Sequence, residues 1–217
     1  MTDPVYSRLL EVMRQRGGPY AGAAIPEFFA LVEVLFTPGE AALNNALTRK
    51  PAPAGDIAAR LGRPETEVAD GLEEMANKGL CAAFVSDGRR VYQGVPFMPG
   101  IFEYQFMPGR DTARHRQLAR LIRDYKVAYR SAVGAADVRF PATRVITVDR
   151  TIHAGNTIHT YDQVASYIDK YASIGVGTCY CRHAARLRGE DTHGLPMEVC
   201  LWFGAGADFA VERLGGR

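Results

Sequence analysis

Hydrophobic and polar positions alternate with two different periods along the chain, which predicts an α+β fold. Amphipathic or apolar stretches predict helices over 5–16, 27–36, 54–61 and 64–78. Between them, Thr37-Pro38-Gly39-Glu40 has the pattern of a capping box with proline at the first helical position, which predicts another helix ending near Thr48. Two short strands, 80–85 and 89–92, flank Asp87-Gly88, a strong signal for a β-hairpin.

This order of elements predicts an N-terminal winged helix-turn-helix domain over residues 1–95. In such a domain the second helix of the motif enters the DNA major groove, and its outer face needs cations or amides. Here the outer face carries one cation, Lys78, and five carboxylates: Glu65, Glu67, Asp70, Glu73 and Glu74. The repulsion from phosphate argues against DNA binding and favours a structural or protein-docking role. Cys81, at the start of the hairpin, is expected in the core.

Residues 96–135 are predicted to form a linking strap and an amphipathic helix. The tetrapeptide F-M-P-G occurs at 97–100 and again at 106–109, in a stretch whose prolines exclude a regular helix. We expect a buried strap between domains; the alternative is an exposed strip that binds a partner. The helix, 111–131, has an apolar face and a basic face, and the basic face is either simply solvated or the docking surface for an acidic partner protein.

Residues 136–217 are predicted to form a small α/β domain that binds a metal or a cluster. We expect a strand over 143–149, a polar loop with surface histidines His153 and His159, a helix from Thr160 to Ser173 and a closing helix over 205–214.

The candidate chemistry lies between the last two helices, where three of the four cysteines occur within residues 173–204. Cys179 and Cys181 are separated by one residue, so in an extended segment their side chains leave the same face. The candidate ligands are Cys179, Cys181, His193 and Cys200, with His183 in reserve, and apolar residues of 195–203 would exclude water. Four interpretations remain open: a Cys3His zinc site, an iron–sulfur cluster, buried or redox-active thiols, and a disulfide.

Two motifs in this segment resemble a known family. The runs C-Y-C-R-H (179–183) and P-M-E-V-C-L-W-F-G-A-G-A-D-F (196–209) are similar to the C-x-C-R-H and P-x-E-V-C-L-x-F-G motifs of bacterial and archaeal 4Fe-4S binding proteins of the ferredoxin type. Members of that family have a winged-helix-like region before these motifs and a ferredoxin module after them. The resemblance implies a 4Fe-4S cluster on Cys179, Cys181 and Cys200, with His193 standing where the family usually has a cysteine. The match reaches only to about Asp208, so it implies cluster binding without establishing a complete electron-transfer protein.

Composition and charge narrow the classes of function. The chain has 217 residues, 47% hydrophobic and 23% charged, with a formal net charge of +2, which is typical of a globular protein of one or two domains. The near-neutral balance gives no argument for nucleic acid or membrane as a partner, and no run is long enough to span a bilayer. The first residues lack the pattern of a signal peptide, so we expect a cytoplasmic protein with reduced thiols.

The usual catalytic patterns, among them the nucleophile elbow and the phosphate-binding loop, are missing, and we do not expect an enzyme by itself. We expect a cytoplasmic iron–sulfur protein that relays electrons to a redox partner protein or serves as an accessory subunit of a redox system. The alternatives are a winged-helix regulator that senses metal or redox state, and an interaction domain stapled by zinc. The electron donor, the acceptor, any substrate and the oligomeric state stay open.

Overall fold

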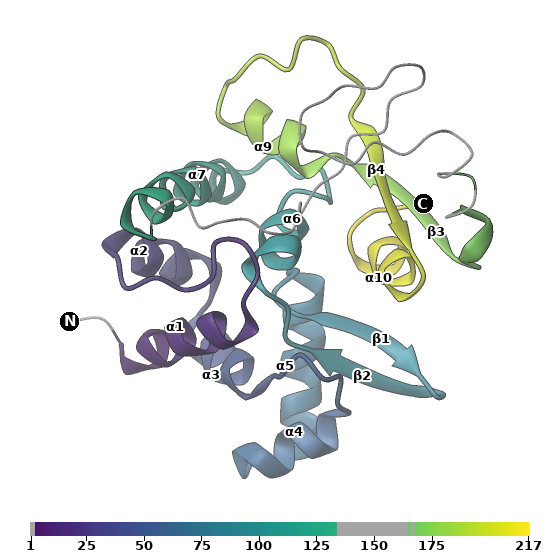
Figure 1. The fold of residues 1–217 in the computed structure, drawn as a ribbon. Helices are drawn as coiled ribbons and strands as arrows, with labels where there is room; N and C mark the ends of the chain where they lie inside the picture. Colours follow the sequence, from purple (N-terminus) through teal and green to yellow (C-terminus); the bar gives the residue numbers. More distant parts are fainter. Residues whose placement is uncertain (1–2, 134–164, 166–167) are drawn as a thin grey trace.

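The structure is a computed structural model and describes residues 3–133, 165 and 168–217 (Figure 1). Within these residues helices are combined with two antiparallel two-stranded sheets, so the fold is α+β, as predicted. The first five helices are α1 (Pro4–Arg16), α2 (Pro26–Leu35), α3 (Pro38–Ala46), α4 (Ala54–Leu61) and α5 (Glu65–Asn77). Each lies within about two residues of its predicted range, because amphipathic periodicity and capping are local signals.

The start of α3 shows how local chemistry defines a helix end. The Thr37 hydroxyl accepts a hydrogen bond from the Glu40 N–H at 3.2 Å, and the Glu40 carboxylate accepts one from the Thr37 N–H at 2.8 Å. This is the predicted capping box, which satisfies two backbone donors that the helix itself cannot satisfy. The Lys78 ammonium, 2.7 Å from Glu40, ties the end of α5 to the same point.

The predicted hairpin is also present, as β1 (Ala82–Ser86) and β2 (Arg89–Gln93). Ser86 pairs with Arg89, which leaves Asp87 and Gly88 as the two-residue loop. Both loop residues have positive φ, 49° and 72°, the conformation that Asp-Gly adopts readily in a hairpin turn. Helices α3 to α5 and this hairpin follow one another in the predicted order, and the winged helix itself stays a prediction.

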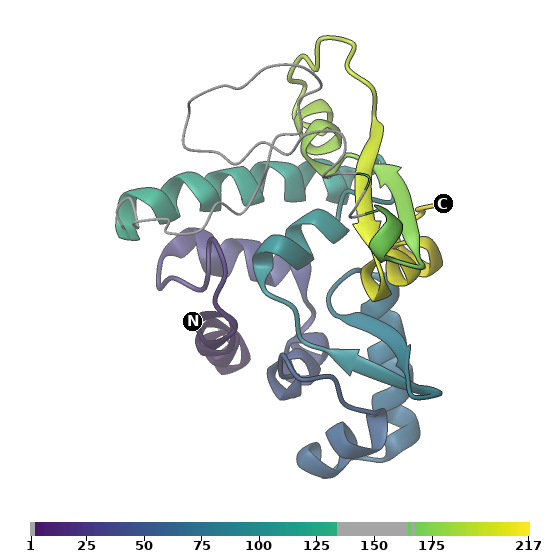
Figure 2. The same ribbon diagram turned by 45° about the vertical axis from the view of Figure 1, so that its right-hand side comes forward.

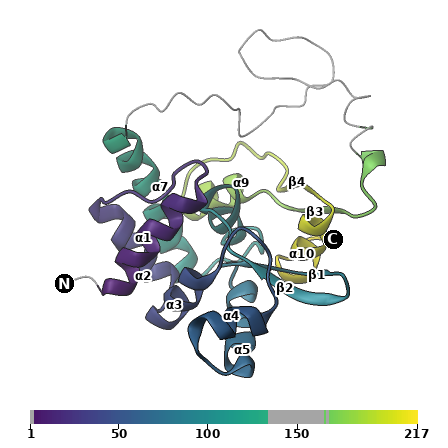
Figure 3. The same cartoon turned by 60° about the horizontal axis from the view of Figure 1, so that its bottom comes forward.

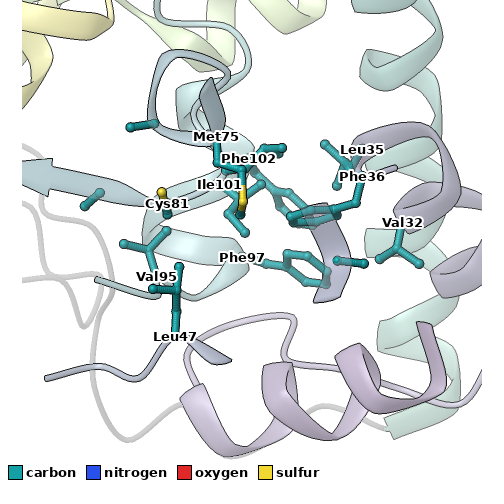
Figure 4. Packing of buried hydrophobic residues seen from close by; sticks show 14 of the residues in the cluster. Val32, Leu35, Phe36, Leu47, Met75, Cys81, Val95, Phe97, Ile101 and Phe102 are labelled. Atoms are coloured by element: carbon teal, nitrogen blue, oxygen red, sulfur yellow. The ribbon is translucent and has the colours of Figure 1, made fainter. Parts of the chain in front are cut away.

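The strap is buried, as predicted. After β2 the chain makes an irregular turn, Phe97–Ile101, and a short helix, α6 (Phe102–Tyr104). The Phe97 and Phe102 rings stack with their centroids 4.7 Å apart, and both side chains are almost completely excluded from solvent (Figure 4). The alternative of an exposed partner-binding strip is therefore wrong, because the aromatic side chains of this stretch are part of the core.

Helix α7 (Ala113–Val133) follows the strap and packs against α2. Its buried face carries Leu118, Ile122 and Tyr125, and the Tyr125 hydroxyl donates to the backbone carbonyl of Ala21 at 2.5 Å. The observed bounds are close to the predicted 111–131. No helix among the described residues is both long enough and apolar enough to cross a membrane.

The last part of the chain contains β3 (Ile174–Thr178), α9 (Tyr180–Leu187), β4 (Glu198–Phe203) and α10 (Ala205–Arg213). Only α10 matches a predicted element, the closing helix. In Figure 2 the β3–β4 pair stands with α9 toward its upper end and α10 at its lower end. The predicted strand 143–149, most of the helix from Thr160 and both surface histidines, His153 and His159, lie outside the described residues.

One continuous cluster of buried hydrophobic residues runs from α1 to α10. It includes Cys81, which is buried as predicted (Figure 4), and it also includes Leu187 and Phe209 from the C-terminal part. Helix α10 lies beside the β1–β2 hairpin (Figure 3). Buried residues from both sides of the predicted domain boundaries near 95 and 135 belong to this one cluster. The boundaries themselves stay a prediction.

Candidate metal centre

Cys179 and Cys181 lie at a junction between a strand and a helix. Cys179 is the N-cap residue of α9; its N–H donates to the Met197 carbonyl at 2.6 Å, and its own carbonyl accepts from the His183 N–H at 2.9 Å. Cys181 is in the first turn of that helix. The assumption of an extended C-x-C segment is therefore wrong, because the chain turns into a helix directly after Cys179.

The pairing of β3 with β4 places Cys200 close to this junction. Cys200 is opposite Gly177, and an irregularity follows, since Thr178 pairs with Glu198. A side chain at position 177 would meet the Trp202 ring, which lies 2.8 Å from where a Cβ atom would be. Gly177 thus allows the two strands and the tryptophan to approach closely, which brings Cys200 next to Cys179.

Neighbouring thiols affect the pKa values of Cys181 and Cys200. Burial, the adjacent Cys179 thiol and, to a smaller extent, Cys181 together raise the pKa of Cys200 to about 11, against a lowering by the Tyr180 backbone N–H. Burial also raises the pKa of Cys181; a hydrogen bond from Tyr180 opposes this and Cys179 adds to it. Cys200 and Cys181 are therefore protonated at neutral pH, and binding of a metal would release these protons.

Neither candidate histidine is placed as a fourth ligand. His183 is buried with its Nε2 atom 3.0 Å from the Arg110 carbonyl, so its ring is bound to the segment before α7. His193 lies in an exposed turn with φ of 52°, and its Nδ1 atom is 3.0 Å from the Asp191 carboxylate. Within the described part of the chain, no three His, Cys, Asp or Glu side chains form a group that could hold a metal ion. The sequence placed both histidines between the cysteines, but helix α9 and the turn after it carry them elsewhere.

The expected apolar wall is only partly present. Leu195, Val199 and Leu201 are 49%, 45% and 44% exposed. Side chains alternate along β4, so Val199 and Leu201 point away from the side that carries Cys200 and Trp202. Trp202 packs against the core next to Gly177.

Three polar side chains that were not singled out from the sequence surround Cys181. Burial raises the pKa of the Tyr180 hydroxyl, and the neighbouring Cys181 and Glu103 raise it further. The Glu103 carboxylate accepts from the Gly100 N–H at 2.8 Å, and burial raises its pKa. Burial lowers the pKa of Lys126, whose ammonium lies near Glu103 and Cys181. In the sequence, the one feature that could have pointed to this polar group is Glu103, the single carboxylate in the aromatic strap of residues 95–110.

The donor set can be compared with the two metal centres that the sequence allows. Zinc binds each thiolate at about 2.3 Å, which requires the ligands of one ion to converge closely. The ligands of an iron–sulfur cluster bind different iron atoms and stand further apart. Among the described residues no three His, Cys, Asp or Glu side chains form a group that could hold a metal ion, so the choice between zinc and a cluster stays a prediction.

No family model matches the chain, and no curated protein or solved structure is similar enough to count as a match. The likeness to ferredoxin-type proteins thus stays a prediction from two short motifs. What the structure adds is the arrangement of Cys179, Cys181 and Cys200 and of the polar side chains around them.

Proposed function

We propose that this chain is an iron–sulfur protein that binds a 4Fe-4S cluster through Cys179, Cys181 and Cys200. It would relay electrons or serve as an accessory subunit of a redox system in the cytoplasm, where thiols stay reduced. The observation that carries the proposal is the position of Cys200, which the β3–β4 pairing brings beside Cys179 although they are far apart in the sequence. The fourth corner of the cluster would be left to a ligand other than the described residues.

In this proposal the chain holds the ligands and tunes their charge. A cluster of this kind, when bound, accepts and releases single electrons. The Met197 carbonyl fixes the backbone of Cys179, and Tyr180 donates its hydroxyl hydrogen to the Cys181 sulfur. The nearby Lys126 ammonium favours the thiolate form of Cys181. Hydrogen bonds and positive charge at ligand sulfurs both favour the reduced, more negative state of a cluster.

We also propose that the N-terminal region is a winged helix used for docking and not for DNA. The outer face of α5 exposes Glu65, Glu67, Asp70 and Glu74. Glu73 on the same helix accepts a hydrogen bond from Arg213 of α10, so the C-terminal part occupies one side of this helix. An acidic surface of this kind repels phosphate and suits a redox partner with a basic surface.

The test is anaerobic purification with assays of iron, acid-labile sulfide and zinc. We expect iron and sulfide in stoichiometric amounts and a broad absorbance at about 400 nm that is lost in air. Substitution of Cys179, Cys181 or Cys200 by serine should lower the iron content strongly. Cys81→Ala is the matched control, because this buried thiol lies in the core and should leave the iron content unchanged. Stoichiometric zinc without iron or sulfide would overturn the proposal and favour a zinc-stapled interaction domain.

A further inference from the structure

A pocket of about 460 Å³ lies between α7 and α9, directly beside Cys181. Its exposed apolar surface comes mainly from Val127, while Phe102, Phe106 and Ile122 line it as nearly buried side chains. Tyr180 and Cys181 line it from the first turn of α9, and charged residues of α7 and of the segment just after α9 surround it: Arg123, Lys126, Arg130, Arg188 and Glu190. A concave, partly apolar site with a few converging polar groups is the usual form of a small-molecule site.

The charges around the pocket do not balance. Glu190 is its single carboxylate, and it is already bound by Arg123 at 2.9 Å and by Arg188 at 2.8 Å. The remaining cations are Lys126 and Arg130, and within the described residues neither has a carboxylate oxygen within 4 Å. Among the lining residues the Lys126 and Arg130 end of the pocket therefore carries an excess of positive charge, with the buried Glu103 carboxyl near Lys126 but outside the lining.

Aromatic rings hold these two cations in place. The Lys126 ammonium lies 5.3 Å from the Tyr20 ring centroid and 5.4 Å from that of Phe102. The Arg130 guanidinium stands 5.5 Å from the Tyr20 ring centroid and donates a hydrogen bond to the Tyr20 hydroxyl. The rings and the neutral hydroxyl orient the cations without neutralising them, and the carboxyl near Lys126 is the buried Glu103, whose own pKa is raised by burial. Within the described residues both cations can therefore face an anion in a partly desolvated setting.

We propose that this pocket binds a small organic anion whose carboxylate or phosphate group pairs with Lys126 and Arg130. Its aromatic or acyl body would lie against Val127, which is 57% exposed, and the partly exposed Tyr180 ring, which an inorganic ion would leave uncovered. This inference goes beyond the proposed function, since it holds with or without a cluster. If Cys181 ligates a cluster, the bound anion would lie next to that ligand.

The test is isothermal titration calorimetry of the full chain with three matched probes: 2-naphthoate, 2-naphthyl phosphate and the neutral 2-naphthamide. We expect at least one anion to bind, and the amide to bind at least about tenfold more weakly, which is about 1.4 kcal/mol. The preferred anion then distinguishes a carboxylate ligand from a phosphate ligand. This comparison uses the unaltered protein and does not depend on the folding of a variant.

Variants then locate the site. Lys126→Met and Arg130→Gln each remove one cation and should weaken binding of the anion by about tenfold. Arg120→Gln is the matched control, because it removes an exposed cation of the same helix that does not line the pocket, and it should leave the affinity within about twofold. Equal binding of anion and amide, an equal loss in Arg120→Gln, or no binding of either anion at about 5 mM would overturn the proposal.

Iron and sulfide are measured on the same preparations, so that the two proposals fail separately. Cluster-bearing protein that binds neither anion overturns the pocket alone. Protein that binds 2-naphthoate but contains no iron or sulfide overturns the proposed cluster alone.

Discussion

Arg213 joins the C-terminal part of the chain to the N-terminal helices, and its replacement should destabilise the whole fold. Its guanidinium donates to Glu73 at 2.5 Å and to Asn77 at 2.6 Å, both on α5, and it also lies 2.8 Å from Glu212. The Arg213 side chain is only 9% exposed, so water cannot easily replace these partners. Arg213→Met keeps much of the aliphatic stem and removes the charge and the donors.

The expected loss follows from what remains after the substitution. A hydrogen bond to a charged group contributes about 1.5–3 kcal/mol when it is protected from water. Glu73 retains the Tyr92 hydroxyl at 2.7 Å and Arg90 at 3.5 Å, so its carboxylate is not left without partners. We therefore expect a loss of about 2 kcal/mol, below the value for a fully buried and orphaned charge.

The assay is chemical denaturation of the protein, with Arg217→Met as the matched control. Arg217 also forms a two-pronged pair with a carboxylate, Glu198, at 3.0 and 2.7 Å. Its side chain is 73% exposed and that of Glu198 is 56% exposed, so the control should lose less than about 0.5 kcal/mol. Equal losses in the two variants, or no loss in Arg213→Met, would refute the argument from burial.

Two further predictions concern the same joint and the cysteine site. Gly177→Ala should lower the free energy of unfolding by about 1–3 kcal/mol, because its Cβ would press on the Trp202 ring, and it should lower the iron content by displacing β4. Gly206→Ala is the control in the same denaturation assay: no atom lies near its Cβ position, so it should be neutral or stabilising. Although burial opposes it, hydrogen bonds from Tyr92 and Arg213 lower the pKa of Glu73 below 4.5, so its stabilisation is present at neutral pH and lost as the pH falls through the folded-state pKa. Acid titration of Tm should show a shallower decline in Glu73→Gln than in the unaltered protein, and parallel curves would contradict this assignment.

Short-range sequence patterns were enough to predict the helices and the hairpin of residues 4–93. The Thr37–Glu40 capping box and the Asp87-Gly88 turn each involve a few neighbouring residues, and the structure confirms both. The cysteines were also recognisable as candidate ligands from their spacing. Each of these features depends on interactions within one or two turns of chain, which a sequence pattern records directly.

Burial and ligand placement were decided by the tertiary structure. Arg16 belongs by pattern to the polar positions of α1, yet it is 3% exposed and donates to the Asn44 side chain at 2.6 Å and to the Leu47 carbonyl at 3.1 Å. His193, expected as a ligand, instead faces solvent beside Asp191. In each case the deciding partner comes from how the backbone turns or packs, which composition and periodicity do not encode.

The site itself shows the same division. The sequence determined that Cys179, Cys181 and Cys200 exist, with soft donor atoms suited to a metal or a cluster. Only the pairing of β3 with β4 decided that Cys200 lies beside Cys179, and only the packing of the strap and α7 against α9 brought Glu103 and Lys126 toward Cys181. Contacts between distant segments depend on the packing of the whole core, because each is favourable only once the elements that carry it are already in place.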